Sequence, residues 1–151
     1  MTATNHVVTG IAIVALVPNP AISLPLAFLA HFALDALPHF GDRKHRSKSL
    51  DRLRYVLPID MALAAVPLLL LVILQPEHWF LLALGGVLCA SPDLMWIPKY
   101  VRHLRGLPEA PKNWLMRFHS WIQWGERLWG IWVELAWFVA TSWLVLHVLY
   151  Y

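Results

Sequence analysis

The stretch AHFALDALPHF, residues 30–40, places three ionisable side chains in an otherwise apolar part of the chain. His31, Asp35 and His39 are each four residues from the next, a spacing at which side chains share one face of a helix. Ionisable groups on an apolar helical face are costly without partners, and inside membranes they mark functional sites. The stretch therefore predicts a helix of a membrane protein that forms one wall of a functional site.

The composition also favours the membrane class. The chain has 151 residues, of which 59% are hydrophobic and only 14% charged. Soluble domains carry about 25% charged residues. We expect a single membrane-embedded helical domain over residues 1–151, and we expect MTATNHVVTG, which has no basic region or clean cleavage site, to belong to the mature protein. The single cysteine, Cys89, excludes an internal disulfide and a cysteine-based metal site.

The chain divides into five apolar segments, at 6–17, 21–37, 55–75, 78–97 and 127–151. The last three are long enough for a hydrocarbon core about 30 Å thick, whereas the first is short and could be tilted or re-entrant, hairpinned onto the second. Apolar residues at 114–122 recur on one helical face, which predicts an amphipathic helix in the interface. The predicted fold class is all-α: a polytopic membrane protein of about five transmembrane or re-entrant helices plus this cytoplasmic interfacial helix.

Charge predicts the orientation. Half of the twelve Lys and Arg residues fall in Arg43–Arg54 and the other half in Lys99–Arg127. The positive-inside rule therefore places both basic stretches in the cytoplasm of a bacterial-type inner (plasma) membrane, with the C-terminus outside. No recognition motif accompanies the basic charge, so no nucleic-acid partner is expected.

The same orientation brings polar residues from several segments into one layer. Asp60 lies six residues beyond Arg54, about 9 Å along a helix, and Asp93 precedes Lys99 by the same interval. The layer as a whole contains His6, His31, Asp35, His39, Asp60, Asp93, His119 and Glu134. Residues placed by chance would be found at both ends of the helices, so we interpret the layer as one site near the cytoplasmic side.

Histidine and aspartate offer nitrogen and oxygen ligands, which suit zinc first and manganese or iron as alternatives. The candidate metal ligands are His6, His31, Asp35, His39, Asp93 and His119. Such a set exceeds the needs of one tetrahedral ion, and two ions bridged by a carboxylate would use it better. A pair of ions can activate water and clamp a phosphoryl oxygen. Glu134, or Asp60 where it is not a ligand, is the candidate general base.

Each residue also has a structural alternative. Asp60 after Pro58 and Asp93 after Pro92 could be acids in the first turn of a helix. His6 could be an interfacial side chain, His119 could be an exposed residue of the amphipathic helix, and Glu134 could pair with a basic residue.

Three motifs, NHVVTG, HFALDALPHF and RFHSW, resemble those of bacterial inner-membrane metal-dependent hydrolases, the family described as LexA-binding inner-membrane-associated hydrolases. HFALD followed by Pro38 and His39 is also similar to the ligand helix of zinc-dependent phospholipases C. The resemblance implies that His6, His31, Asp35, His39 and His119 hold metal.

These observations predict a membrane-embedded, metal-dependent hydrolase. Its expected substrate is a phosphoester on a lipid or isoprenoid at the cytoplasmic leaflet, and its expected partners are membrane lipids. Two alternatives stay open: an ion or proton transporter, because buried ionisable groups also mark ion pathways, and a non-catalytic membrane protein with a structural metal. The sequence leaves the oligomeric state open.

Overall fold

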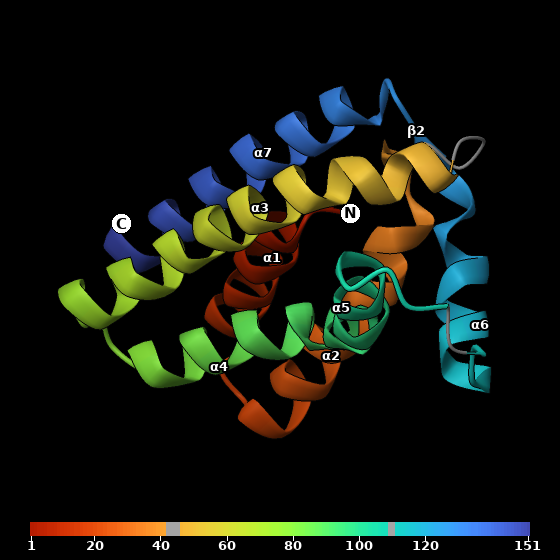
Figure 1. Ribbon diagram of the computed structural model, residues 1–151. Helices are drawn as coiled ribbons and strands as arrows, with labels where there is room; N and C mark the ends of the chain where they lie inside the picture. Colours follow the sequence, from red (N-terminus) through yellow and green to blue (C-terminus); the bar gives the residue numbers. More distant parts are fainter. Residues whose placement is uncertain (42–45, 109–110) are drawn as a thin grey trace.

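The chain is built almost entirely of helices, and the all-α prediction is confirmed (Figure 1). The computed structural model describes residues 1–41, 46–108 and 111–151, with the side chains of 46–54 left out. The longer helices are α1 (Ala3–Leu16), α2 (Pro20–Ala36), α3 (Arg46–Leu74), α4 (Trp79–Ala90) and α7 (Gly130–Tyr150). The shorter elements are η2 (Ser91–Trp96), α5 (Ile97–Leu104), α6 (Trp114–Ile122), η3 (Gln123–Gly125) and the two-residue strands β1 (His39–Phe40) and β2 (Glu126–Arg127), which pair in parallel.

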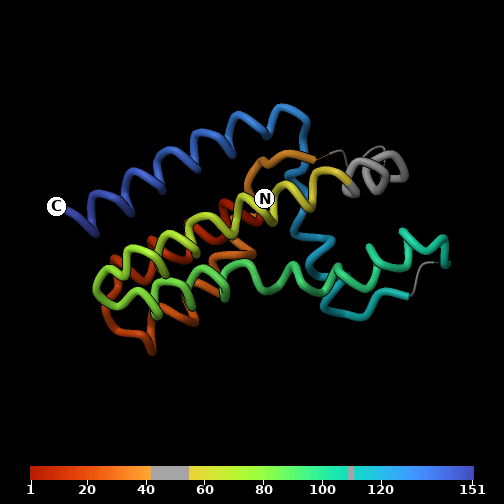
Figure 2. Tube along the Cα trace, turned by 60° about the vertical axis from the view of Figure 1, so that its left-hand side comes forward, coloured from red at the N-terminus to blue at the C-terminus, as the bar shows by residue number. Residues whose placement is uncertain are grey.

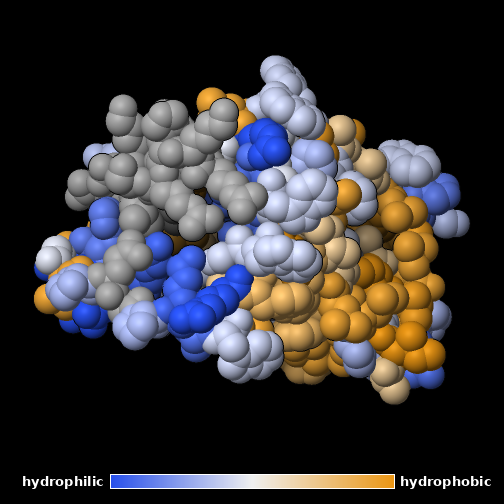
Figure 3. Space-filling model, turned by 90° about the vertical axis from the view of Figure 1, so that its right-hand side faces the viewer, coloured by the Kyte–Doolittle hydropathy of each residue, from blue (hydrophilic) through white to orange (hydrophobic). Residues whose placement is uncertain are grey.

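Among the described residues, three helical stretches are long and apolar enough to cross a membrane: Tyr55–Leu74, Trp79–Leu104 and Gly130–Tyr150. Their large apolar side chains lie largely on the outside of the bundle. Ile73 of α3, for example, is 73% exposed and Val139 of α7 is 66% exposed. Figure 3 shows a broad hydrophobic area beside a hydrophilic one on the same face. A helix that is apolar on all sides needs apolar surroundings, so the arrangement is consistent with a membrane protein.

Helices α1 and α2 have 14 and 17 residues, fewer than the about 20 that a span requires. Helix α1 contacts α2, α3, α4 and α7, and α7 runs along one side of the bundle (Figure 2). The core between α1, α3 and α4 contains Val7, Ile11, Val14, Leu71 and Leu82. The N-terminal turn of α1 is thereby held inside the protein, where His6 is fully buried.

Two glycines set the spacing between α1 and α4. A Cβ atom on Gly10 would lie 2.2 Å from the carbonyl oxygen of Gly85, and one on Gly85 would lie 2.4 Å from Cγ2 of Val14. Small residues allow two helix backbones to approach this closely. The contact places the end of α4, and Asp93 just beyond it, close to α1.

The predicted apolar segments 55–75 and 78–97 match the apolar stretches Tyr55–Leu74 and Trp79–Leu104, but the helices extend or divide them. Helix α3 begins at Arg46, before its apolar segment, because the basic stretch consists largely of good helix formers such as Arg, Lys and Leu; residues 42–45 of that stretch lie outside the described part of the chain. The predicted segment 78–97 is not one continuous α-helix, because the 3₁₀ turn η2 interrupts it at Pro92. Proline lacks the N–H that an α-helix needs at that position.

Candidate metal centre

Four side chains from three elements converge in the interior. His31 and Asp35 come from α2, Asp93 from η2 and His119 from α6, and one ligand atom of each lies within 4.8 Å of the others. The side chains of His31, Asp35 and His119 are fully buried, whereas that of Asp93 is 31% exposed. The group could therefore hold a metal ion.

Local structure explains how these residues meet. His31 and Asp35 are four residues apart and share one face of α2. The change from α4 into η2 at Pro92 turns Asp93 toward that face. Gly125, which follows α6, packs against the end of α2, and a Cβ atom there would lie 2.5 Å from the carbonyl oxygen of Leu37. A larger residue would push the end of α6, and with it His119, away from α2.

The distances between the donor atoms fit a coordination sphere. His119 Nε2 is 2.7 Å from Asp35 Oδ2 and 3.0 Å from His31 Nε2, and His31 Nε2 is 3.4 Å from Asp35 Oδ2. Asp93 Oδ1 is 3.8 Å from both ring nitrogens. Ligands about 2.0–2.2 Å from a tetrahedral ion are separated by about 3.3–3.6 Å. The observed values bracket that range.

The two rings differ in the position of their proton. His31 Nδ1–H donates to the Cys89 carbonyl oxygen over 2.8 Å, so its Nε2 carries a lone pair and is ready to bind a metal. His119 Nδ1 instead accepts the indole N–H of Trp96 over 3.0 Å. Because an indole N–H can only donate, the proton of neutral His119 is on Nε2 and points to Asp35. Metal binding at this nitrogen requires the Trp96 contact to open.

His6 of α1 lies on the other side of the two carboxylates. Its Nε2 is 3.2 Å from Asp35 Oδ1 and 4.0 Å from Asp93 Oδ2. Its ring stacks on that of His31, with 4.0 Å between the centroids. The α-amino group of Met1 also contacts Asp35 Oδ1. The alternatives that His6 is an interfacial side chain and that His119 is an exposed residue of the amphipathic helix are wrong, because both are fully buried.

His39 of β1 and Glu134 of α7 lie outside the four-residue group, and Glu134 connects α7 to β1. His39 is buried, and its Nδ1–H donates to the Leu37 carbonyl oxygen over 2.8 Å. Burial lowers the pKa of His39 to about 4, so the ring is neutral at pH 7. Glu134 is also buried, and its Oε1 accepts the Phe40 backbone N–H over 3.0 Å. A metal-binding role for His39 and a catalytic role for Glu134 stay predictions.

Asp60 holds the beginning of α1. Its two carboxylate oxygens accept the backbone N–H groups of Ala3 and Thr4 over 2.6 and 3.1 Å, and the Thr4 hydroxyl donates to it over 2.7 Å. The alternative that Asp60 lies in the first turn of its own helix is wrong, because α3 begins at Arg46. A general-base role for Asp60 stays a prediction.

Asp93 lies in the first turn of η2, after Pro92, as its structural alternative predicts. The Ser91 hydroxyl donates to the Leu88 carbonyl oxygen over 2.8 Å and makes no cap hydrogen bond at the start of η2. Asp93 also joins the histidine–aspartate cluster.

Sequence reasoning missed three groups around the cluster. Gln123 donates from Nε2 to Asp35 Oδ2 over 3.3 Å, and Trp96 and the Cys89 carbonyl orient the two histidine rings. Gln123 follows His119 by four residues and Trp96 follows Asp93 by three, so helical spacing could have indicated both side chains. A backbone carbonyl leaves no comparable signal in the sequence.

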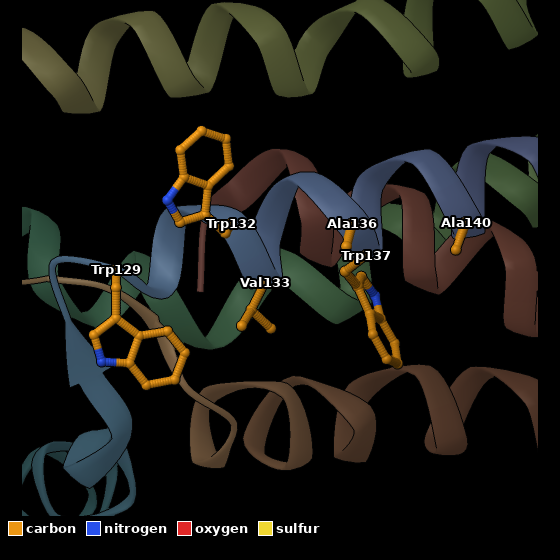
Figure 4. Close-up of a pocket in the computed structure, with 6 residues that line it drawn as sticks. All are labelled: Trp129, Trp132, Val133, Ala136, Trp137 and Ala140. Carbon is orange, nitrogen blue, oxygen red and sulfur yellow. The ribbon is translucent and has the colours of Figure 1, made fainter.

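A separate groove of about 470 Å³ runs along α7 (Figure 4). It is lined by Trp129, Trp132, Val133, Ala136, Trp137 and Ala140, all of them apolar or aromatic. The Trp137 indole N–H donates to the Thr9 hydroxyl over 2.9 Å, which ties this wall to α1. The groove contains no candidate metal ligand and is distinct from the cluster.

The fold and the site define a helical protein that has, in the part of the chain that the structure describes, three membrane-length helices and a buried histidine–aspartate cluster that could hold a metal ion. No protein-family model, curated protein or solved structure matches the chain.

Proposed function

We propose that the protein is a membrane-embedded, metal-dependent hydrolase of a phosphoester on a lipid or isoprenoid. The observation that carries the proposal is the convergence of the fully buried side chains of His31, Asp35 and His119 at coordination distances. Their nitrogen and oxygen donors suit zinc, with manganese or iron as alternatives. The hydrolase class is taken from the resemblance to the inner-membrane metal-dependent hydrolases.

Asp93 has the role of the metal ligand on the side of the centre where the attacking water enters. It is the only partly exposed member of the four-residue group, so water reaches the centre on its side. Asp93 Oδ1 lies 3.8 Å from the Nε2 atoms of His31 and His119, which is farther than Asp35 Oδ2 lies from the same two atoms. A bound divalent ion lowers the pKa of water toward about 7 and polarises a phosphoryl oxygen.

The surroundings of the centre support an anionic amphiphile as substrate. Helix α5, which follows Asp93, carries Lys99 and Arg102, and α6, which holds His119, carries Arg117. Basic residues beside a membrane attract anionic headgroups and mark the cytoplasmic side. We therefore assign the site to the cytoplasmic leaflet of the inner membrane, with the C-terminus outside.

A test combines metal analysis with a phosphoester screen on detergent-purified protein. Wild type supplied with zinc is expected to hold the metal, and Asp35→Asn is expected to lose it because Asp35 is central to the cluster. Asp93→Asn is expected to weaken metal binding and, with it, turnover, because it removes the negative charge of one ligand. His78→Asn, at the opposite end of α4, is the matched control and is expected to change neither.

A structural metal is the second candidate, because four convergent side chains can close a tetrahedral site. A wild type that holds metal but turns over no phosphoester would favour it. Wild type that binds no metal when zinc is supplied would refute both functions.

A further inference from the structure

The two aspartates of the cluster divide their oxygens between two groups of histidines. Asp35 directs Oδ2 to His119 and His31, and it directs Oδ1 to His6. Asp93 does the same, with Oδ1 3.8 Å from His31 and His119 and Oδ2 4.0 Å from His6. One ion between His31 and His119 uses one oxygen of each aspartate. The other two oxygens and His6 form a second set of donor atoms.

We propose that His6 Nε2, Asp35 Oδ1 and Asp93 Oδ2 hold a second metal ion, so that both carboxylates bridge a dinuclear centre. This inference rests on the proposed function, because it needs the first ion between His31 and His119. Two-metal hydrolytic sites have their ions about 3.5–4 Å apart, a separation that one bridging carboxylate spans.

The position of His6 supports the second ion. The ring is fully buried, and its Nδ1 has no hydrogen-bond partner among the described residues. Its orientation is therefore fixed by stacking on His31 and by its Nε2, which faces the two carboxylates. A histidine with only a packing role would not need to direct a nitrogen at two acids.

Charge identifies the substrate class of such a centre. Asp35 and Asp93 carry two negative charges, which a single divalent ion neutralises. A second divalent ion leaves two positive charges in a buried site, which a phosphate monoester dianion would balance. The dinuclear centre therefore favours phosphomonoesters over neutral esters.

The α-amino group of Met1 is the competing partner for this side of the site, because it contacts Asp35 Oδ1. If that cation alone balances the charge, the centre binds one metal ion and His6 has only a packing role. The number of bound ions distinguishes the two arrangements.

The experiment measures metal stoichiometry and Mn²⁺ electron paramagnetic resonance on the full chain in detergent, prepared without chelators. Wild type is expected to bind two ions per chain, and its spectrum with two equivalents of Mn²⁺ is expected to show exchange coupling. His6→Ala is expected to bind one ion with an uncoupled spectrum, and His78→Asn is the matched control that keeps two. If His6→Ala does not fold, the Mn²⁺ spectrum of the wild type is sufficient to decide between one bound ion and two coupled ions.

One ion per wild-type chain would overturn the second site and leave the proposed function in place. Two ions without exchange coupling would overturn the bridging carboxylates. No ion at all would overturn the proposed function itself, and the dinuclear centre with it. If two coupled ions are found, inorganic phosphate, which is the product of phosphomonoester hydrolysis, is expected to bind them and to change the spectrum. A spectrum that does not change when inorganic phosphate is added would contradict the substrate class.

Discussion

Trp96→Phe is expected to tighten metal binding, which is the reverse of the usual effect of removing a group next to a ligand. In the structure the Trp96 indole N–H donates to His119 Nδ1 over 3.0 Å. When Nε2 of His119 binds a metal, the proton of the neutral ring is on Nδ1, and two N–H groups then face each other. The wild type must therefore break this hydrogen bond to bind metal, whereas the phenylalanine variant has no such bond to break.

The size of the effect follows from the value of one hydrogen bond. Trp96 is only half-buried, so its indole N–H can turn to other partners after release, and the lost bond is worth about 0.5–1.5 kcal/mol. This corresponds to an affinity for zinc that is about two- to tenfold higher in Trp96→Phe than in wild type.

The assay is a competition titration with a chelator of known affinity, with Trp114→Phe as the matched control. Trp114 lies at the start of α6 and is 77% exposed, so its replacement is expected to leave the affinity unchanged. Groups that support a metal ligand usually cost 10–100-fold in affinity when removed. A loss of that size in Trp96→Phe would refute the reasoning and would mean that Trp96 holds His119 in its metal-binding orientation.

Three further substitutions test the structure around the centre by thermal unfolding in detergent. Gly85→Ala is expected to destabilise the protein by about 1–3 kcal/mol, because the added Cβ atom would lie 2.4 Å from Val14 Cγ2; an unchanged melting temperature would contradict the close α1–α4 contact. Asn113→Ala removes the cap of α6, whose Oδ1 accepts the Met116 N–H over 2.8 Å, and should cost about 1 kcal/mol, whereas no loss would speak against this cap. Ser23→Ala removes a buried hydroxyl that has no partner in the described part of the chain, and should leave stability unchanged or raise it by up to about 1 kcal/mol; a clear loss would show that the hydroxyl has a partner.

Much of the fold follows from local sequence signals. Long apolar runs predict α3 and α7, and the one-sided pattern at 114–122 predicts α6 with its observed bounds. The pairing of α1 with α4 does not follow in this way. It depends on the contact between Gly10 and Gly85, and a glycine inside an apolar segment does not indicate which helix it meets.

The cluster could be predicted only in part, for a similar reason. His31 and Asp35 share a helical face, so their spacing indicates the site directly. Asp93 and His119 come from elements that are distant in the sequence. Only their predicted depth near the cytoplasmic side indicated that they join His31 and Asp35. Asp60 shows the limit of that argument, because it lies in the same predicted layer but binds the first backbone N–H groups of α1. Depth along a helix does not specify the direction of a side chain around it.

The same contacts couple the packing of α1 to the chemistry of the centre. Asp60 fixes the first turn of α1, only two residues before His6, and the Gly10–Gly85 contact fixes the distance between α1 and α4. Asp93 follows α4, so these two contacts together set the separation between His6 and Asp93. A metal ion that binds only this folded arrangement stabilises it by mass action. Packing substitutions in α1 should therefore weaken metal binding as well as stability, although none of the packing residues touches the ion.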